Sequence, residues 1–407
     1  MQVLKQKIQS KKAVVAVIGL GYVGLPLARA IKQAGFEVIG IDIRKIKDKI
    51  IKTTNSYDEL KKADIIIICL PTPLTKHKEP DMSYIKAGLR EIKKRLRKNK
   101  LVILESTTYP GTTEEILLPA LKSTGLKVGQ DFFLAFVSER LDPGNKKFNI
   151  KNTPKVIGGV TRNCTNLTRL FYQQFVDEVF SVSSPKVAEM SKLLENIFRI
   201  VNISMINELM MLCDKMQIDI WEVIEAAKTK PFGFMPFYPS AGAGGHCIPI
   251  DPFYLSWKAK EYGFFTRFIE LAGEINELMP HYVVTKIIWA LNNQEKSIKN
   301  SKILIWGIAY KKDIADTRES PAIKIIWDLM RKGARIFYHD PYVPEIEINN
   351  KRFKSVKLTN QILKNVDCLL ILTDHSGYDY EDLTKKAKLV VDTKNIVKTK
   401  LSNVYKL

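Results

Sequence analysis

A glycine-rich turn near the start of the chain constrains the fold more than any other feature. The sequence GLGYVG at 19–24 follows an apolar run at 13–19 and precedes a segment at 25–33 with apolar residues at helical spacing. A strand, a G-x-G-x-x-G turn and a helix in this order are typical of a dinucleotide-binding sheet. The first glycine permits the tight turn, the second lets the backbone approach a pyrophosphate, and the third lets helix and strand pack closely.

An acidic residue in the expected place supports this interpretation. Asp42 ends the second apolar run, eighteen residues after Gly24, where a carboxylate accepts hydrogen bonds from the adenosine ribose. A carboxylate there repels a 2′-phosphate, which favours NAD over NADP, although the nearby cations Arg44 and Lys45 favour a phosphate. The next strand is expected near 53–54, about ten residues later, and a crossover between parallel strands usually takes a dozen or more. We therefore expect the second crossover helix to be short or replaced by a loop.

The remaining apolar blocks indicate the architecture. Continuous apolar runs predict strands buried on both faces of a parallel sheet. They lie at 64–71, 101–107, 155–160, 302–310, 334–341, 368–375 and 388–397, with helices expected at 82–98 and 320–333. Residues 186–219 have apolar side chains at three- and four-residue spacing without Gly or Pro, which predicts one long helix.

The expected fold class is α/β, with two Rossmann-like parallel-sheet domains joined by a long central helix. We divide the chain into a dinucleotide-binding domain (1–185), a central helical domain (186–300) and a second Rossmann-like domain (301–407). The second sheet echoes the first, because Asp367 precedes its strand as Asp64 precedes its own, but it lacks a full glycine fingerprint. The long apolar helix also predicts a homodimer interface.

The charge of the chain is high but unevenly placed. The formal net charge is +21 over 407 residues, with +15 in residues 1–185, −1 in 186–300 and +7 in 301–407. The basic residues are not interleaved with aromatic ones, as they are in proteins that bind single-stranded nucleic acid. We therefore attribute most of the charge to solvated surface and expect no nucleic-acid partner.

Cysteine usage and hydropathy indicate the cellular compartment in which the protein is expected. The five cysteines form no short-spaced pair, which argues against a disulfide framework and favours a reducing cytoplasm. The Lys-rich lead-in lacks the apolar stretch of a secretory signal, and no run approaches the ~20 apolar residues of a membrane span. We expect a cytoplasmic protein without membrane insertion or a metal site.

Five motifs together resemble one enzyme family. They are PTP (71–73), ESTTYPGTT (105–113), EMSKLLEN (189–196), GGHCIPIDP (244–252) and AYKKDIADTRESPA (309–322). With the glycine turn, and in this order along nearly the whole chain, they resemble the nucleotide-sugar 6-dehydrogenases, the relatives of UDP-glucose dehydrogenase. The sequences HCIP (246–249) and TKPFGFMPFYP (229–239) are similar to the branch that acts on UDP-N-acetylhexosamines.

This resemblance implies an NAD-dependent oxidation of a sugar C6 hydroxyl to a carboxylate, with two NAD used per sugar. The favoured substrate is UDP-N-acetylglucosamine; the alternatives are UDP-N-acetylmannosamine, then UDP-glucose, and a catalytically impaired homologue. Cys247 would trap the intermediate aldehyde as a thiohemiacetal, and a second oxidation would give a thioester that water releases. The cysteine-containing loop departs from the usual form of the branch, since SAGA (240–243) stands where a Gly-Pro-Gly run is common.

The resemblance also implies roles for other residues. Lys192 would stabilise the oxyanion, with Asn196 as its polar neighbour on the same helix face. Asp251 would order the catalytic water together with Lys192. Glu139 is a candidate base for hydrolysis, and Thr107 would lie beside the nicotinamide and that water.

The binding residues follow from the same motifs. The expected cofactor-binding residues are Gly19, Gly21, Tyr22, Val23, Gly24, Asp42, Pro71, Thr72, Thr107 and Arg318. The expected substrate-binding residues are Tyr238, Gly242, Gly244, His246, Tyr310 and Lys311. His246 either faces the N-acetyl group or packs behind the loop, and both interpretations stay open.

Overall fold

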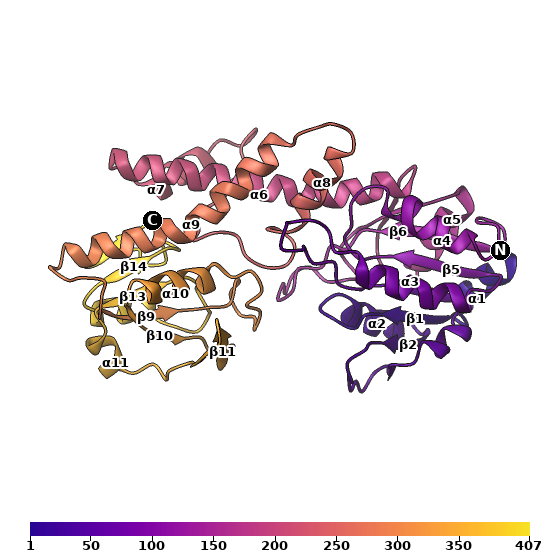
Figure 1. Cartoon of the computed structure of the whole chain (residues 1–407), viewed down its shortest axis with the longest axis horizontal. Helices are drawn as coiled ribbons and strands as arrows, with labels where there is room; N and C mark the ends of the chain where they lie inside the picture. Colours follow the sequence, from indigo (N-terminus) through magenta and orange to yellow (C-terminus); the bar gives the residue numbers. More distant parts are fainter. The chain divides into compact units, whose positions relative to one another are not determined.

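The computed structural model describes all residues from 1 to 407 (Figure 1). The chain forms two compact units, Met1–Glu195 with Phe253–Phe265, and Asn196–Pro252 with Thr266–Leu407. The division into 1–185, 186–300 and 301–407 remains a sequence-based prediction. None of the helices combines the length and apolar character needed to cross a bilayer.

The first unit is built on an eight-stranded sheet. Its strand order is β3-β2-β1-β4-β5-β6-β7-β8. The strands are β1 (Val14–Ile18), β2 (Glu37–Ile41), β3 (Lys52–Thr54), β4 (Ile65–Ile68), β5 (Lys100–Leu104), β6 (Phe132–Val137), β7 (Lys155–Gly159) and β8 (Val179–Ser181). β7 runs antiparallel to β6, so the sheet is mixed, whereas the sequence predicted parallel strands throughout. The polypeptide returns from β6 through 138–154 without a helix, which allows this reversal.

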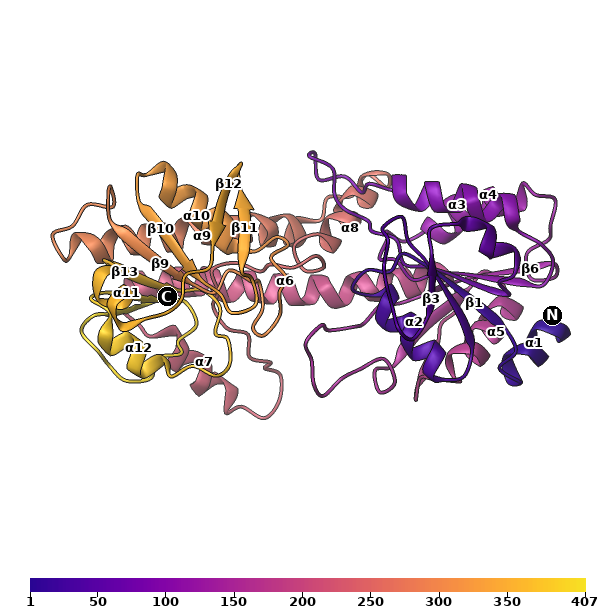
Figure 2. The ribbon, with the colours of Figure 1, turned by 90° about the horizontal axis from the view of Figure 1, so that it is seen from below.

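Helices cover both faces of this sheet (Figure 2). The helices are α1 (Gln2–Gln9), α2 (Gly24–Gln33), α3 (Ser83–Arg95), α4 (Leu118–Lys122) and α5 (Arg162–Tyr172), with single turns η1 (Tyr57–Lys61) and η2 (Thr113–Leu117). α2 and α5 contribute Leu27, Ile31 and Phe171 to a core that also contains Val15 and Ile65 of the sheet. The first helix was not predicted; it forms because Leu4 and Ile8, four residues apart, are both buried.

The connection after β2 contains no helix, which confirms the expectation from its length. β2 ends at Ile41 and β3 begins at Lys52. Asp48 organises the loop between them: its carboxylate accepts hydrogen bonds from the backbone N–H of Ile50 and Ile51 at 2.8 and 3.1 Å, and from Arg29 Nε of α2 at 2.9 Å. Ile51 is buried, so one apolar side chain of the loop covers the sheet where a helix usually lies.

The second unit contains a five-stranded parallel sheet of order β10-β9-β13-β14-β15, and a separate hairpin of β11 and β12. The strands are β9 (Lys302–Trp306), β10 (Arg335–His339), β11 (Glu345–Ile348), β12 (Lys351–Lys354), β13 (Cys368–Ile371), β14 (Val390–Asp392) and β15 (Val404–Lys406). The helices are α7 (Ile220–Lys228), α9 (Arg267–Asn292), α10 (Pro321–Arg331), α11 (Asn360–Asn365) and α12 (Tyr380–Lys386), and α8 (Asp251–Lys260) begins at the unit boundary.

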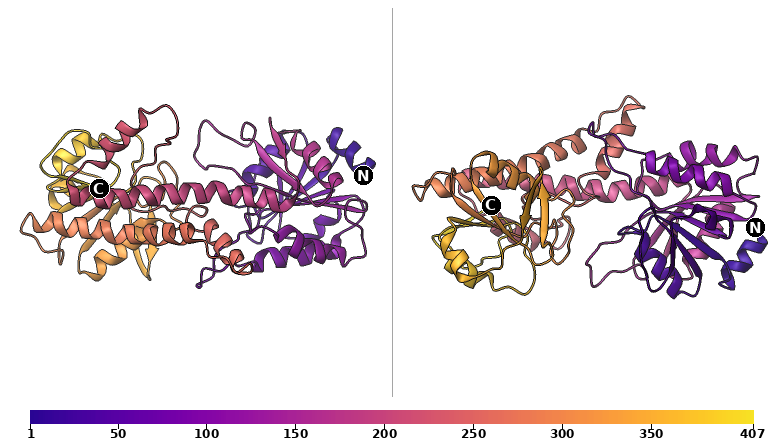
Figure 3. Two further views of the ribbon diagram at one scale, coloured as in Figure 1. Left: turned by 90° about the horizontal axis from the view of Figure 1, so that it is seen from above. Right: turned by 60° about the horizontal axis from the view of Figure 1, so that its bottom comes forward.

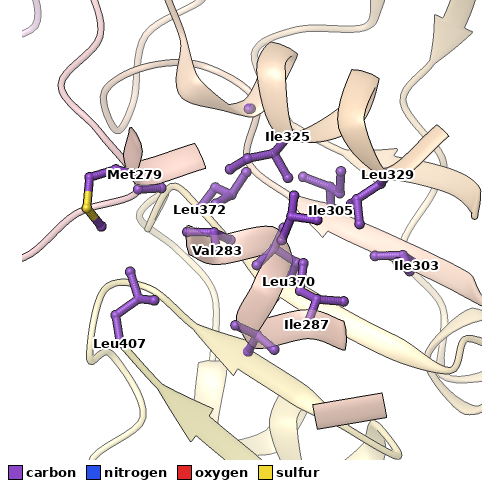
Figure 4. Close-up of a cluster of buried hydrophobic side chains, with 14 of the residues drawn as sticks. Met279, Val283, Ile287, Ile303, Ile305, Ile325, Leu329, Leu370, Leu372 and Leu407 are labelled. Carbon is purple, nitrogen blue, oxygen red and sulfur yellow. The ribbon is translucent and has the colours of Figure 1, made fainter. Parts of the chain in front are cut away.

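The predicted long helix is α6 (Pro185–Met216), which is 32 residues long. Within the second unit it runs beside α9 (Figure 3), held by a hydrogen bond from Ser204 Oγ to the Ala272 carbonyl at 2.8 Å and by the Lys286–Asp214 ion pair at 2.5 Å. The core of this unit lies between α9, α10 and the sheet (Figure 4). It contains Met279, Val283, Ile287, Ile303, Ile305, Ile325, Leu329, Leu370, Leu372 and Leu407.

The two sheets repeat one local structure, as the sequence indicated. Asp64 accepts a hydrogen bond from the Val14 N–H at the start of β1 at 3.0 Å, and Asp367 accepts one from the Lys302 N–H at the start of β9 at 2.8 Å. At the opposite edge, Gly19 and Gly307 both follow the first strand with positive φ angles of 91° and 77°. Asp42 and Asp340 follow β2 and β10, and each accepts hydrogen bonds from the turn after the first strand.

Candidate active site

The glycine turn has the geometry that a pyrophosphate requires. Gly19 has a φ of 91°, which favours glycine, and a Cβ there would overlap the Cys69 carbonyl. A Cβ on Gly24 would overlap the Gly19 carbonyl, so only glycine lets α2 begin this close to β1. Nothing lies within 4 Å of a Cβ built on Gly21, which leaves its backbone open to a ligand. Tyr22 is exposed and Val23 caps α2. The turn and the start of α2 thus fit the diphosphate of NAD.

Asp42, which follows β2, is the residue expected to bind the ribose of that cofactor. Its carboxylate accepts hydrogen bonds from the Leu20 N–H at 2.8 Å, from the Arg44 N–H at 2.9 Å and from Arg44 Nε at 3.1 Å. Burial opposes the charge on Asp42, but these hydrogen bonds outweigh it and lower the pKa of the carboxyl group. The Arg44 side chain is therefore folded onto the carboxylate that a ribose would use.

Replacing Asp42 by alanine should raise the KM for NAD about tenfold or more, because a charged hydrogen bond to the ribose is lost. The discrimination against NADP should fall, since the repelling carboxylate is removed and Arg44 becomes available to a 2′-phosphate. Initial rates with NAD and with NADP measure both the KM for NAD and the discrimination between the two cofactors. Asp58→Ala, an exposed change in the same unit, serves as the control, and an unchanged KM for NAD in Asp42→Ala would contradict the assignment.

The carboxyl ends of β4 and β5 bring the PTP and EST motifs together. Thr72 Oγ1 donates a hydrogen bond to the Thr107 carbonyl at 2.9 Å, and Ser106 Oγ donates one to the Leu70 carbonyl at 2.7 Å. Pro71 precedes Thr72 and is exposed. Because the ends of parallel strands share one edge of a sheet, these turns lie at the edge that holds the glycine turn. The Thr107 side chain, half-buried, follows β5 there.

Two buried ion pairs lie in the first unit. Glu139 Oε2 is 3.6 Å from Lys192 Nζ of α6, and both side chains are buried. The Glu139 carboxylate also accepts a hydrogen bond from the Leu141 N–H. Glu105, from the EST motif, pairs with Lys155 at 2.5 Å and accepts a hydrogen bond from Tyr172 OH at 2.5 Å. The structure thus pairs two predicted catalytic residues, and the sequence did not identify the second pair.

A third buried acid, Glu189 of α6, holds the PGTT turn at 110–113. Its fully buried carboxylate accepts hydrogen bonds from the Gly111 N–H at 2.6 Å, the Thr113 N–H at 2.9 Å and Thr113 Oγ1 at 2.7 Å. Burial raises the pKa of Glu189 to about 7, despite these hydrogen bonds. The side chain is therefore a structural support for the segment that follows Thr107.

This raised pKa predicts a pH dependence of stability. A carboxyl group with a raised pKa in the folded state stabilises the fold fully below its unfolded pKa, near 4.5, and this contribution is lost as the pH rises through about 7. The shift corresponds to ~3 kcal/mol. Glu189→Gln should therefore flatten the fall in unfolding free energy between pH 5 and 8, measured by urea titration. Glu208→Gln, exposed on the same helix, should keep the wild-type slope; an equal slope in Glu189→Gln would contradict the prediction.

The second unit carries the cysteine loop. Cys247 is half-buried, and its carbonyl accepts the Asp251 N–H at 2.9 Å, which closes one turn at the start of α8. Asp251 is buried, and its Oδ2 accepts a hydrogen bond from Asn196 Nδ2 at 2.6 Å. The structure therefore connects three predicted catalytic residues, Cys247, Asp251 and Asn196, through one backbone turn and one side-chain hydrogen bond.

Two asparagines that the sequence did not single out fasten the glycine part of this loop. Asn276 of α9 accepts the Ala243 N–H at 2.6 Å and donates to the Ala243 carbonyl at 3.3 Å. Asn207 of α6 accepts the Ser240 N–H at 2.9 Å. The SAGA segment, unusual for the branch, is thus held by side chains from two helices. Their positions on α6 and α9 follow no motif, so only the tertiary structure identifies them.

A cavity of about 640 Å³ lies beside this loop, wholly within the second unit. Five of the six predicted substrate residues line it, namely Tyr238, Gly242, Gly244, Tyr310 and Lys311. The other lining residues, which the sequence missed, include Arg199, Trp221, Glu225, Lys394 and Lys398. Four cations and three aromatic rings in one cavity suit a nucleoside diphosphate, because the rings offer stacking surfaces and the cations match phosphates.

Two predicted ligand-binding residues have other environments. His246 is not among the residues that line the cavity, and burial, together with the charge of Arg318, lowers its pKa. Arg318 pairs with Asp316 through its guanidinium at 2.6 Å, and its carbonyl accepts the Gly245 N–H at 3.0 Å. It belongs to the second unit, whereas the glycine turn belongs to the first.

Comparison with known proteins identifies the family of the chain. Three domain models of one family match it in order: the NAD binding domain at 13–52 and 44–176, the central domain at 186–278, and the UDP binding domain at 304–399. The chain belongs to the UDP-glucose/GDP-mannose dehydrogenase family. It is therefore an oxidoreductase with NAD as its cofactor, and the NAD binding domain of the family contains the glycine turn and Asp42 described above.

Relatives of this UDP-glucose/GDP-mannose dehydrogenase family match over most of the chain. Protein CapL of Staphylococcus aureus is 35% identical over 96% of this chain and 97% of its own length. A UDP-N-acetyl-D-glucosamine 6-dehydrogenase of Pseudomonas aeruginosa is 34% identical over 81% of this chain and 83% of its own length. The solved structure of a UDP-D-ManNAc dehydrogenase from Pyrococcus horikoshii is similar with a TM-score of 0.86 and 31% identity, over 97% of this chain and 98% of that one.

Proposed function

We propose that the protein oxidises the C6 hydroxyl of a UDP-N-acetylhexosamine to a carboxylate in two NAD-dependent steps. The observation that carries this proposal is the position of Cys247 at the end of the glycine loop that lines the basic, aromatic cavity. A nucleophilic cysteine beside a nucleotide-sized cavity suits a reaction that retains an aldehyde between two oxidations. The matches to an NAD binding and a UDP binding domain support it.

The identity of the N-acetylhexosamine is the finer part of the proposal. The sequence favoured UDP-N-acetylglucosamine, and the relatives carry names of both epimers at comparable identity. UDP-N-acetylmannosamine dehydrogenases match 94–97% of this chain, and the similar solved structure from Pyrococcus horikoshii bears that name. We therefore propose UDP-N-acetylmannosamine as the first substrate to test and UDP-N-acetylglucosamine as the second.

Cys247 acts as the nucleophile in the proposed mechanism. NAD, held by the glycine turn and Asp42, would supply the hydride acceptor for both oxidations of C6. The Cys247 thiolate adds to the carbonyl carbon of the aldehyde and forms a thiohemiacetal, which keeps the intermediate on the protein. After the second oxidation the same sulfur leaves from the thioester as water adds, so one thiolate serves both steps.

The charged residues are proposed to stabilise the developing oxyanion and to position the attacking water. The Lys192 ammonium stabilises negative charge on the C6 oxygen, and its partner Glu139 at 3.6 Å keeps that buried cation compensated. The Asn196 amide fixes the Asp251 carboxylate, which orders the attacking water, and Glu139 accepts a proton during hydrolysis. Thr107 is proposed to lie beside the nicotinamide.

NADH production from a panel of nucleotide sugars tests the proposal. The panel contains UDP-N-acetylmannosamine, UDP-N-acetylglucosamine, UDP-glucose and GDP-mannose, with the product identified by mass spectrometry. Two NADH per UDP-N-acetylhexosamine and a uronic acid product support it. No NADH from any sugar would instead support a catalytically impaired homologue, in which the short loop after Asp42 does not support NAD binding.

We also propose that the protein forms a homodimer through α6. Within the second unit, exposed apolar side chains recur on this helix at helical spacing: Phe198, Met205, Leu209, Leu212 and Met216. A contiguous apolar stripe on a long helix suits a self-complementary interface. Light scattering should give the mass of a dimer for the wild type and of a monomer for Leu209→Glu/Leu212→Glu. Glu208→Gln is the control, and a monomeric wild type would contradict the proposal.

A further inference from the structure

One segment of the second unit supports both the cavity and the cysteine loop. Residues 310–320 contain no helix or strand, yet they supply Tyr310 and Lys311 to the cavity wall. The ring of Tyr310 packs on Gly245, because a Cβ added to that glycine would lie 2.8 Å from the ring. The Arg318 carbonyl accepts the Gly245 N–H at 3.0 Å. The position of this segment, which we call the substrate loop, therefore determines the shape of the cavity.

The substrate loop adopts a backbone conformation that needs support. Asp313 and Glu319 have positive φ angles of 62° and 48°, in the left-handed region that residues other than glycine seldom adopt. Such conformations are energetically unfavourable and persist only where the surroundings hold them. Residues outside the loop must therefore hold the backbone conformation of Asp313.

A buried histidine provides this support. The His375 side chain is fully buried, its Nδ1 accepts the Asp313 N–H at 3.0 Å, and its Nε2 lies 3.1 Å from Asp340 Oδ2. Because Nδ1 accepts a hydrogen bond, the ring proton is on Nε2 and is donated to Asp340. The next residue, Ser376, donates its N–H and its hydroxyl to the Asp313 carboxylate at 2.8 and 2.7 Å.

Asp340 in turn is fixed to the sheet. Its carboxylate accepts the N–H groups of Ile308 and Ala309 after β9, at 2.8 and 3.0 Å, and those of Tyr342 and Val343 at 2.9 and 3.1 Å. Burial opposes its charge, but the hydrogen bonds from His375 and these N–H groups outweigh it and lower the pKa of Asp340. The histidine thus connects the loop to a rigid anion at the end of β10.

The repeat between the two sheets shows which position Asp340 and His375 occupy. Asp42 in the first sheet and Asp340 in the second occupy equivalent positions after the second strand of their sheets. The Asp42 carboxylate is paired with the Arg44 side chain, which is exposed, so a ribose hydroxyl can displace it. The Asp340 carboxylate is covered by a fully buried histidine ring, which leaves it no room for a sugar hydroxyl.

We infer that His375 is a positioning residue for the nucleotide-sugar: it occupies the ribose position of the second sheet and uses it to hold the substrate loop. The inference rests on the proposed function for its ligand. Loss of the ring nitrogens removes the acceptor of the Asp313 N–H and leaves Asp313 held only through its carboxylate, chiefly by Ser376. The loop backbone, and with it the Tyr310 and Lys311 side chains, then becomes less firmly placed. The glycine turn and Asp42 belong to the first unit and Arg318 is the one expected cofactor residue in the loop, so NAD binding should change much less than sugar-nucleotide binding.

Two variants and two ligands test the inference. His375→Phe keeps the ring shape and removes both hydrogen bonds, whereas His375→Gln keeps one donor and one acceptor. His375→Phe should weaken UDP binding in calorimetry, and raise the KM for the UDP-sugar, about ten- to a hundredfold, as expected for the loss of buried hydrogen bonds. The KM for NAD should stay within about twofold, and His375→Gln should recover part of the loss.

The control is His339→Phe, because His339 bonds to the Val356 carbonyl and Tyr378 and does not contact the loop. Melting temperatures confirm that each variant is folded. Wild-type UDP affinity in folded His375→Phe would overturn the inference, and so would an equal rise in the KM for NAD. UDP affinity is measured without turnover, so a wild type that binds UDP but oxidises no sugar would refute the proposed function alone.

Discussion

Replacement of Cys247 by serine should lower the rate of acid formation by at least about a thousandfold, in the range seen when a covalent nucleophile is removed. A serine hydroxyl is almost entirely protonated at neutral pH and is a poor leaving group, so neither the aldehyde adduct nor its release proceeds efficiently. The sugar nucleotide should still bind with nearly wild-type affinity, because the cavity residues are unchanged. NADH yield per sugar, with the aldehyde trapped by a hydroxylamine, measures both the residual first oxidation and the block.

The matched control is Cys213→Ser on α6, which is also half-buried but lies outside the cysteine loop. It should retain full activity. Complete conversion to the uronic acid by Cys247→Ser would exclude the thioester route. Slow turnover that stops after one NADH per sugar would support it, since the trapped aldehyde is the intermediate that the cysteine normally holds.

Lys192→Ala should reduce kcat about a hundred- to a thousandfold, comparable to the removal of one preorganised oxyanion donor. The effect should fall on kcat more than on KM, because the ammonium acts most strongly on charge that develops during the reaction. The change also leaves the buried Glu139 carboxylate without its ion-pair partner at 3.6 Å, so the protein should unfold at a lower temperature.

Lys186→Ala is the matched control for the effects of Lys192→Ala on kcat and on stability. Lys186 is exposed on the same helix and lies 3.6 Å from Glu115, so its loss should leave both kcat and stability nearly unchanged. The double variant Lys192→Ala/Glu139→Gln should regain stability without regaining kcat. Wild-type kcat in Lys192→Ala would refute the oxyanion role.

The first half of the site was predictable because its determinants are local in sequence. The glycines at 19, 21 and 24 and the acid Asp42 lie in one strand–turn–helix–strand unit, and steric limits at Gly19 and Gly24 fix its geometry. The missing crossover helix was equally predictable, since ten residues cannot form it. The fold class followed from the same apolar runs, while the antiparallel β7 did not, because periodicity carries no information on strand direction.

The supporting residues were not predictable in this way. Asn207, Asn276 and His375 reach the cysteine and substrate loops from α6, α9 and the end of β13. Each belongs to an element whose sequence pattern is explained by packing alone, and no fixed spacing relates it to Cys247. Their roles depend on tertiary contacts between segments that are distant in the chain.

The helix-free connection after β2 also has a consequence for solubility. β3 is an edge strand of three residues, and with no helix beside it, its free N–H and C=O groups can pair with a strand of another molecule. Lys45, Lys47, Lys49 and Lys52 are all exposed around that edge. A second copy approaching edge to edge would bring two such lysine groups together, and their mutual repulsion opposes aggregation. Part of the +21 charge therefore protects a strand that a shortened connection leaves uncovered.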